Sequence, residues 1–273
     1  MNIKHMDTTL AEVSSEVEDY WNSHTLGLQY LKDDSLEIGS KEFFDNIRPW
    51  MNPFKFPDVM PRIDRIASRI DGKQVLEIGC GMGFDSVELM KRGAELTATD
   101  LTPSAIELAC RHFRIMNLTP VDARVANVLE LDFPDESFDA VYSIGVVHHT
   151  GDTPRALQEI RRVLKPGGWA VISHIYRRPS FFSALSRLGR ENIEFKEEDA
   201  PVIDFFTEVE ILGMLDGFEV EEMTQDHFRA LPIARQGFKA ALYTFGFKPV
   251  YNLLPVSVAK RFAHKISFIA KKT

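Results

Sequence analysis

The chain has 273 residues, of which 44% are hydrophobic and 26% charged, the composition of a globular protein with a buried core. Its two cysteines, Cys80 and Cys110, are too few for a disulfide scaffold or a metal site made of thiolates alone. No window approaches about 18 consecutive apolar residues, and the start of the chain has no apolar run typical of a signal peptide. We therefore expect a cytoplasmic protein.

The net charge of −8 excludes a general affinity for nucleic acid. The charge is unevenly distributed, because residues 227–273 contain nine Lys or Arg and no acid, whereas residues 191–226 contain 13 acids and one base. The basic, aromatic-rich segment has two interpretations. It could contact an anionic membrane surface as a peripheral protein does, or form a helical cap whose lysines face the acidic neighbour. We favour the cap.

Short β-rich runs alternate with helical stretches between residues 73 and 174, a pattern typical of βαβ units and a parallel sheet. Thr102 and Pro103 suit a helix start, Gly93 suits a helix end, and Gly167-Gly168 predicts a break before the fifth strand. The predicted strands are 74–79, 95–100, 122–126, 138–144 and 169–174, followed later by 217–224 and 264–271. The predicted helices are 84–92, 103–116 and 153–164.

The two ends of the chain differ from this central part. Residues 1–72 lack the alternation and are predicted to form helices and loops, with segment 50–57 too rich in proline for a regular element. About 40 apolar residues separate the last two predicted strands. An insertion of that length within a compact domain is usually functional or forms a cap.

The run Gly79-Cys80-Gly81-Met82-Gly83 ends one predicted strand and opens a helix. Glycines at such a turn let a ligand approach the backbone, and the helix start offers unpaired N–H groups. Asp100 closes the next strand, where a carboxylate can accept hydrogen bonds from both ribose hydroxyls of an adenosine-containing ligand. A tight turn alone would explain the glycines, but the acid in register favours a nucleoside cofactor.

The spacing of the glycines narrows the cofactor class. Dinucleotide enzymes require G-x-G-x-x-G, whereas this chain has G-x-G-x-G preceded by the acid Glu77. An acid beside the loop suits a positively charged ligand better than phosphates. A phosphate-binding P-loop is excluded, since no Gly-Lys-Ser/Thr follows.

These motifs resemble those of the class I S-adenosylmethionine-dependent methyltransferases. The resemblance rests on Glu77, the three glycines, Asp100 and the run 161–168 (RRVLKPGG). The segment 135–150 followed by 161–168 is similar to the ubiquinone/menaquinone-type (type 11) small-molecule methyltransferases. The likeness is strong over residues 73–174 and general elsewhere.

The resemblance implies an α/β, Rossmann-like fold. Its sheet would be mostly parallel and seven-stranded, with an antiparallel last strand and helices on both faces. Residues 1–72 would form an N-terminal helical lid segment. Residues 73–273 would form the methyltransferase domain, with a substrate-cap insertion at about 227–262.

The resemblance also implies S-adenosylmethionine as the cofactor. Gly79 and Gly81 would lie against its methionine part, Glu77 would face its ammonium group, and Asp100 would hold the ribose hydroxyls. Many relatives have an Asp where this chain has Asn127, whose side-chain carbonyl can also accept a hydrogen bond from the adenine amino group. The further cofactor-binding candidates are Cys80, Gly83, Leu101, Val128, Ser143 and Ile144.

The implied reaction is methyl transfer by in-line displacement to the O, N, S or C atom of a small-molecule acceptor. A hydrophobic acceptor is one option. Alignment of the reacting atoms is then the main catalytic effect. His148 and His149 follow the fourth predicted strand and are the catalytic candidates, as a general base or as pocket lining. Alternatively, they only bond loop carbonyls. No spacing of His, Cys, Asp and Glu around them suits a metal.

Eight residues are candidates for contacts with the acceptor, and a structural role remains open for each: Tyr20, Trp21, His24, Tyr30, Arg48, Tyr176, Arg177 and His227. Two functional alternatives also remain open. One is an oxidoreductase that uses a nucleotide cofactor, which the glycine spacing disfavours. The other is a non-catalytic protein that binds S-adenosylmethionine.

Overall fold

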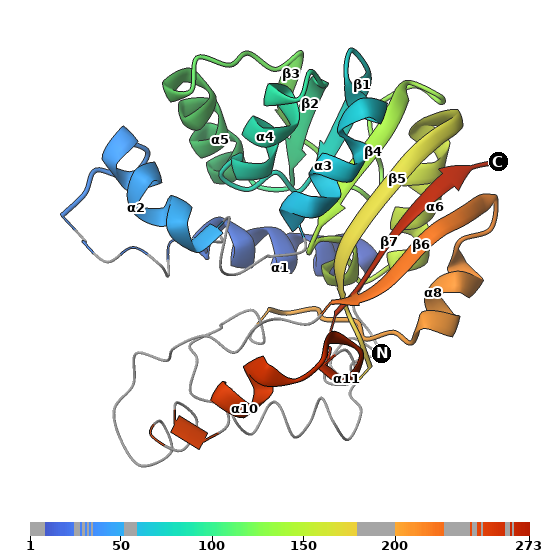
Figure 1. Ribbon diagram of the computed structural model, residues 1–273. Helices are drawn as coiled ribbons and strands as arrows, with labels where there is room; N and C mark the ends of the chain where they lie inside the picture. Colours follow the sequence, from blue (N-terminus) through green and yellow to red (C-terminus); the bar gives the residue numbers. More distant parts are fainter. Residues whose placement is uncertain are drawn as a thin grey trace.

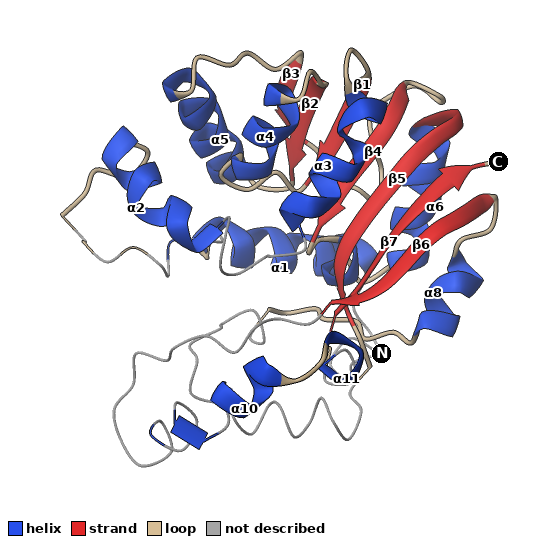
Figure 2. Ribbon diagram, viewed as in Figure 1, coloured by secondary structure: helices blue, strands red, loops and turns tan. Residues whose placement is uncertain are grey.

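The computed structural model contains a central sheet with helices on both faces (Figures 1 and 2). It describes residues 9–24, 28, 31, 33, 35–51, 59–178, 200–226, 241, 245–246, 248–259, 263 and 265–273.

All seven predicted strands form, in the order β3-β2-β1-β4-β5-β7-β6. Strand β7 is antiparallel to both of its neighbours, and the pairs among β1 to β5 are parallel. This arrangement confirms the predicted fold class. The strands are β1 (Gln74–Ile78), β2 (Glu95–Asp100), β3 (Asp122–Val125), β4 (Phe138–Ile144), β5 (Leu164–Tyr176), β6 (Phe218–Asp226) and β7 (Lys265–Lys272).

The two faces of the sheet are covered by different helices. One face packs against α3 (Val59–Ile70), α4 (Phe84–Lys91) and α5 (Pro103–Ile115). The other packs against α6 (Thr153–Val163) and α8 (Glu208–Met214). Alternate residues of each strand contribute to the two cores, as in β4, where Val141 belongs to one and Tyr142 to the other. The helices predicted between the strands form within one residue of their expected ends.

The expected break at Gly167-Gly168 is wrong, because β5 already begins at Leu164 and runs through both glycines. The glycines form an irregularity within the strand, where the pairing with β4 shifts register between Phe138 and Ala140. A Cβ on Gly168 would lie 3.0 Å from the carbonyl oxygen of Asp139. Glycine therefore permits a close approach of two backbones rather than ending the strand.

The N-terminal residues form helices, as expected. Helix α1 (Leu10–Ser23) begins with a capping box between Thr9 and Glu12. Its apolar side packs against Val202 and Leu101 across the end of the sheet. Helix α2 (Lys41–Met51) packs instead against the start of α4 and against α5.

Two short helices, α10 (Lys248–Leu253) and α11 (Val256–Ala259), lie within the predicted cap. Figure 1 shows them beyond the edge of the sheet that α1 crosses. In the part of the chain that the structure describes, no helix has the length and apolar character needed to span a membrane.

Candidate functional site

The glycine loop follows β1, and its three glycines serve different purposes although all have positive φ angles (75° at Gly79, 51° at Gly81 and 74° at Gly83). A Cβ on Gly79 would lie 2.1 Å from Cγ2 of Val146, and one on Gly83 would lie 2.6 Å from the ring of Phe113. A Cβ on Gly81 would meet no atom within 4 Å. Gly79 and Gly83 therefore permit close packing, whereas Gly81 opens onto free space.

Asp100 links the ends of β1 and β2. Its Oδ2 accepts a hydrogen bond from the N–H of Gly81 at 2.9 Å, and its Oδ1 accepts from both the N–H and the hydroxyl of Thr102 at 3.0 Å. Burial raises the pKa of this carboxyl, while the amide bonds oppose the change. Thr102 occupies the predicted N-cap position, but its hydroxyl bonds Asp100 instead of capping α5.

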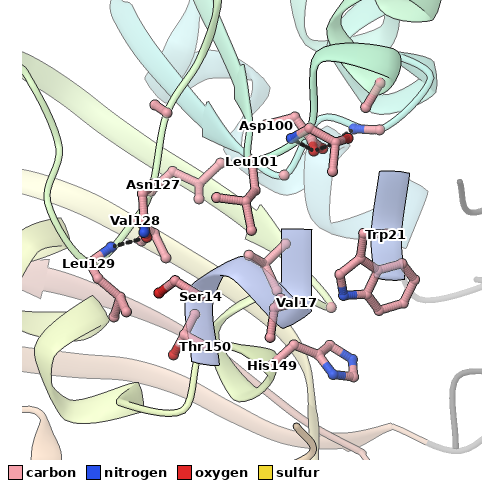
Figure 3. Close-up of a pocket in the computed structure, with 18 of the residues that line it drawn as sticks. Ser14, Val17, Trp21, Asp100, Leu101, Asn127, Val128, Leu129, His149 and Thr150 are labelled. Atoms are coloured by element: carbon pink, nitrogen blue, oxygen red, sulfur yellow. Dashed lines mark hydrogen bonds between the residues drawn. The ribbon is translucent and has the colours of Figure 1, made fainter. Parts of the chain in front are cut away.

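A pocket lies at the carboxyl ends of β1, β2 and β4, where open α/β sheets bind their ligands. Figure 3 shows Asp100, Asn127, Trp21 and His149 around it, with α1 along one side. Nineteen of the described residues line it: Ser14, Val17, Trp21, Ile78, Gly79, Gly81, Asp100, Leu101, Thr102, Ala105, Ala126, Asn127, Val128, Leu129, Ile144, Gly145, Val146, His149 and Thr150. The pocket thus brings together seven of the predicted cofactor residues from four separate parts of the sequence: Gly79, Gly81, Asp100, Leu101, Asn127, Val128 and Ile144.

One wall of the pocket consists of Leu101, Asn127 and Val128. The side-chain Oδ1 of Asn127 accepts a hydrogen bond from the N–H of Leu129 at 2.9 Å (Figure 3). This bond holds the turn after β3 and fixes which end of the amide is the acceptor. The carbonyl oxygen keeps a second lone pair for a ligand.

Four of the predicted cofactor residues do not line the pocket. Glu77 is 3% exposed and accepts a hydrogen bond from the hydroxyl of Ser86 in α4. Ser143 is buried and donates to the carbonyl of Ile78 at 3.1 Å. Cys80 and Gly83 are also buried. Burial raises the pKa of the Cys80 thiol well above its ordinary value, so this cysteine is a packing residue rather than a nucleophile.

His149 lines the pocket from the short helix η3 (Val147–His149). Its Nδ1 lies 2.8 Å from the carbonyl oxygen of Val202, an acceptor that requires Nδ1 to carry the proton. In the neutral ring the lone pair is then on Nε2. The ring of Trp21 meets the His149 ring edge to face, with centroids 5.2 Å apart.

His148 lies behind His149, buried between it and Tyr176, with ring centroids at 4.1 and 4.9 Å. Burial, and secondarily the neighbouring His149, lowers its pKa well below the ordinary value, so the ring is neutral. Among the described residues neither ring nitrogen has a hydrogen-bond partner. His148 does not line the pocket, which makes it a less direct candidate than His149.

Of the N-terminal candidates in the described residues, Trp21 alone lines the pocket. Tyr20 and His24 stack on each other at the end of α1. Arg48 lies away from the pocket, against α5, where it donates to Nε2 of His112 at 3.3 Å. Tyr30 lies outside the described residues.

The candidates at the end of β5, Tyr176 in its last position and Arg177 directly after it, do not line the pocket. Tyr176 is buried against His148, and Arg177 pairs with Glu208 at 3.0 Å. His227 lies outside the described residues. In the described part of the chain, no group of three or more His, Cys, Asp or Glu side chains is placed to hold a metal ion.

Sequence reasoning missed several lining residues. Ser14 and Val17 recur at helical spacing with the predicted Trp21 on α1, so the periodicity of that helix could have identified them. Gly145 has a φ of 72° and, like Gly81, free space where a Cβ would be. Val202 could not have been identified, since only the folded chain brings its carbonyl to His149.

The strand order, the glycine loop and the acid at the end of β2 are the features in which the fold and the site resemble a class I methyltransferase domain. Residues 76–172 match the family model described as a methyltransferase domain. The match confirms the resemblance predicted from the motifs, and with it S-adenosylmethionine as the cofactor of such a domain. The open space at Gly81 and the buried Asp100 carboxylate fit a nucleoside ligand that carries a positive charge.

One curated protein is similar to this chain in sequence, and two solved structures are similar to it in fold. It is 36% identical over 135 residues to a ubiquinone biosynthesis O-methyltransferase of Xanthomonas oryzae pv. oryzae, a match that covers 48% of this chain and 56% of the relative. The chain thus spans about half the length of the curated relatives it matches. Magnesium protoporphyrin IX methyltransferase of Synechocystis PCC 6803, solved with bound SAH, superposes with a TM-score of 0.59 at 14% identity, covering 95% and 99% of the two chains. The cyclase SpnF also has a TM-score of 0.59, at 16% identity, with 95% and 96% covered.

Proposed function

We propose that this protein transfers a methyl group from S-adenosylmethionine to a hydroxyl oxygen of a small, hydrophobic acceptor. The observation that carries the proposal is the pocket in which Gly81, Asp100 and Asn127 meet at the ends of adjacent strands. The name of the curated relative supports an oxygen acceptor. Apart from Asp100, the lining is mostly apolar, which supports an adenosine moiety on one side and an apolar acceptor near it.

The roles of the pocket residues follow from their contacts. Asp100 would hold the ribose hydroxyls with the lone pairs that the loop amides leave unused. Leu101 would pack on the adenine ring, and Asn127 and Val128 would bond its edge. Backbone groups of Gly79, Gly81 and Ile144 would contact the methionine part. Glu77 would act on this site only indirectly, since it is buried and bonded to Ser86 and does not line the pocket.

The bound cofactor supplies an activated methyl group on a sulfonium. The protein aligns the acceptor oxygen with that methyl in line with the carbon–sulfur bond, because positioning is the main contribution that such a displacement needs. As the new C–O bond forms, the hydroxyl proton must leave the acceptor. We assign this proton to Nε2 of His149, whose lone pair follows from the bond between Nδ1 and Val202.

Helix α1 forms part of the lid in this proposal. Its Ser14, Val17 and Trp21 line the pocket, and its contact with Val202 links it to the segment that orients His149. Helix α2 of segment 1–72 has a different position, since it packs against α5. The cap at about 227–262 would complete the acceptor side.

Calorimetric titration with S-adenosylhomocysteine tests the cofactor site. Asp100→Ala should weaken binding by a few kcal/mol, on the order of a hundredfold in Kd, whereas the exposed Asp132→Ala should not change it. Thermal melts of both variants establish that they are folded. Absence of binding to folded wild-type protein, or equal Kd values for the two variants, would refute the assignment.

A second experiment separates a methyltransferase from a non-catalytic binder or another enzyme of this fold. Release of S-adenosylhomocysteine is measured with a panel of apolar phenols and catechols. His149→Ala should lower kcat and flatten its pH profile while leaving the Kd for S-adenosylhomocysteine within about threefold. His24→Ala is the matched control, since His24 is an exposed histidine that follows the last residue of α1 and lies outside the pocket. Turnover of the His149 variant at the wild-type rate would exclude the proton-transfer role.

A further inference from the structure

The imidazole of His112 on α5 forms a hydrogen bond to the glycine loop. Its Nδ1 lies 3.0 Å from the carbonyl oxygen of Met82, the residue between Gly81 and Gly83. Because a carbonyl oxygen only accepts, Nδ1 carries the proton of this bond. His112 is fully buried and does not line the pocket. A residue outside the pocket therefore holds the loop that lines it.

Arg48 on α2 determines the state of the other nitrogen of the same ring. Its Nη2 lies 3.3 Å from Nε2 of His112, and a guanidinium can only donate. Nε2 must therefore hold a lone pair, which agrees with a proton on Nδ1. Burial lowers the pKa of His112 to about 4, the bond to Met82 opposes this change, and the charge of Arg48 adds to it. At neutral pH the ring is thus neutral and has a single tautomer.

Two aromatic rings hold the plane of the His112 imidazole. The ring of Phe44 on α2 stacks on it, with centroids 4.3 Å apart and 9° between the planes. Phe84, at the start of α4, meets it edge to face with centroids 4.7 Å apart. Phe44 and Phe84 also share a buried cluster with the side chain of Met82. Helix α2 therefore belongs to the packing that surrounds the second half of the glycine loop.

The bond to Met82 restrains a loop that its glycines leave free. Gly81 and Gly83 flank Met82, and glycine reaches positive φ angles without being restricted to them. Ordering such residues costs backbone entropy, which a ligand must offset if the loop is ordered only on binding. The N–H of Gly81 already donates to Asp100 at 2.9 Å. With the bond from His112, the loop is held on both sides of the peptide that links Gly81 to Met82.

We propose that Arg48 and His112 are positioning residues for the cofactor. Arg48 selects the tautomer of His112, and His112 holds the Met82 carbonyl, so that the loop presents Gly81 to the pocket before the ligand arrives. A loop ordered in advance gives a lower Kd, because less entropy is lost on binding. The inference rests on the proposed cofactor site and extends it to α2, none of whose described residues lines the pocket.

Two substitutions of His112 test the bond to Met82 by calorimetry with S-adenosylhomocysteine. His112→Phe keeps a ring against Phe44 but removes both nitrogens, and it should raise the Kd about tenfold. His112→Asn keeps an N–H donor near the position of Nδ1, and its Kd should stay within about threefold of the wild-type value. Thermal melts separate this role from a purely structural one. The Asn variant loses the stacked ring and should melt below the wild type, so its retained affinity cannot come from retained stability.

Arg48→Met tests the role of Arg48 with the imidazole in place. Met lacks the donor that keeps Nε2 unprotonated, so the other tautomer becomes accessible and the Kd should rise about threefold. The matched control is Arg114→Met, which changes an exposed arginine of α5 and should leave the Kd at the wild-type value.

Two kinds of negative result are distinguishable. Absence of binding to folded wild-type protein would refute the cofactor site itself. Binding by the wild type with equal Kd values for His112→Phe and His112→Asn, or for Arg48→Met and Arg114→Met, would overturn the positioning role and leave the cofactor site intact.

Discussion

Replacement of Glu77 by Gln should change how the stability of the protein depends on pH. The Glu77 carboxyl lies at the end of β1, just before the glycine loop, and is buried. Burial, and secondarily the nearby Asp85, raises its pKa to about 8, although the hydrogen bond from Ser86 acts in the opposite direction. In the unfolded chain the same group has a pKa of 4.5. The unfolded state therefore releases this proton at a lower pH than the folded state does.

The sign and size of the effect follow from linkage. A pKa that is higher in the folded state gives a contribution to stability that is complete below pH 4.5 and is lost as the pH rises through about 8. The difference between these two pKa values corresponds to about 5 kcal/mol, of which about 3 kcal/mol would be lost between roughly pH 5 and pH 8. A domain of this size loses about 2–4 °C in Tm for each kcal/mol of stability lost, so the loss between these pH values corresponds to a fall of roughly 10 °C in Tm. Gln at this position has no proton to lose.

Thermal melts across this pH range measure the effect directly. The wild type should lose roughly 10 °C more than Glu77→Gln between about pH 5 and pH 8, so the difference in Tm between them should grow with pH. Glu130→Gln, which changes an exposed carboxyl, should run parallel to the wild type. If the curves of Glu77→Gln and wild type are parallel, the burial argument for this carboxyl is incorrect.

Three further substitutions separate packing from binding in the pocket. Gly79→Ala should lower the free energy of unfolding by about 2–3 kcal/mol in denaturant melts, because its Cβ would meet Val146. Gly81→Ala should cost about 1 kcal/mol of backbone strain, but its methyl would enter the pocket and weaken S-adenosylhomocysteine binding at least about tenfold by calorimetry; unchanged affinity would contradict the placement. Trp21→Ala should raise that Kd about tenfold with little change in Tm, and an unaltered Kd would show that α1 does not cover the ligand.

Local patterns in the sequence were sufficient for the sheet and for the core of the site. The alternation of β-rich and helical runs predicts the first five strands, and two later β-rich runs predict the last two, because buried strands and amphipathic helices impose their periodicity on nearby residues. The glycine loop and Asp100 could be paired from their spacing, since adjacent parallel strands bring their carboxyl ends together.

Contacts between distant segments were decided only by the tertiary structure. The motif does not distinguish Gly79 from Gly81, because the difference depends on Val146, which belongs to the loop after β4. Arg48 was a plausible acceptor contact by its type, but α2 docks on α5 and directs it to His112. His149 was identified by its place in the chain, whereas its tautomer depends on the carbonyl of Val202, 53 residues further along. Such pairings depend on how helices and loops pack in three dimensions, which local periodicity does not encode.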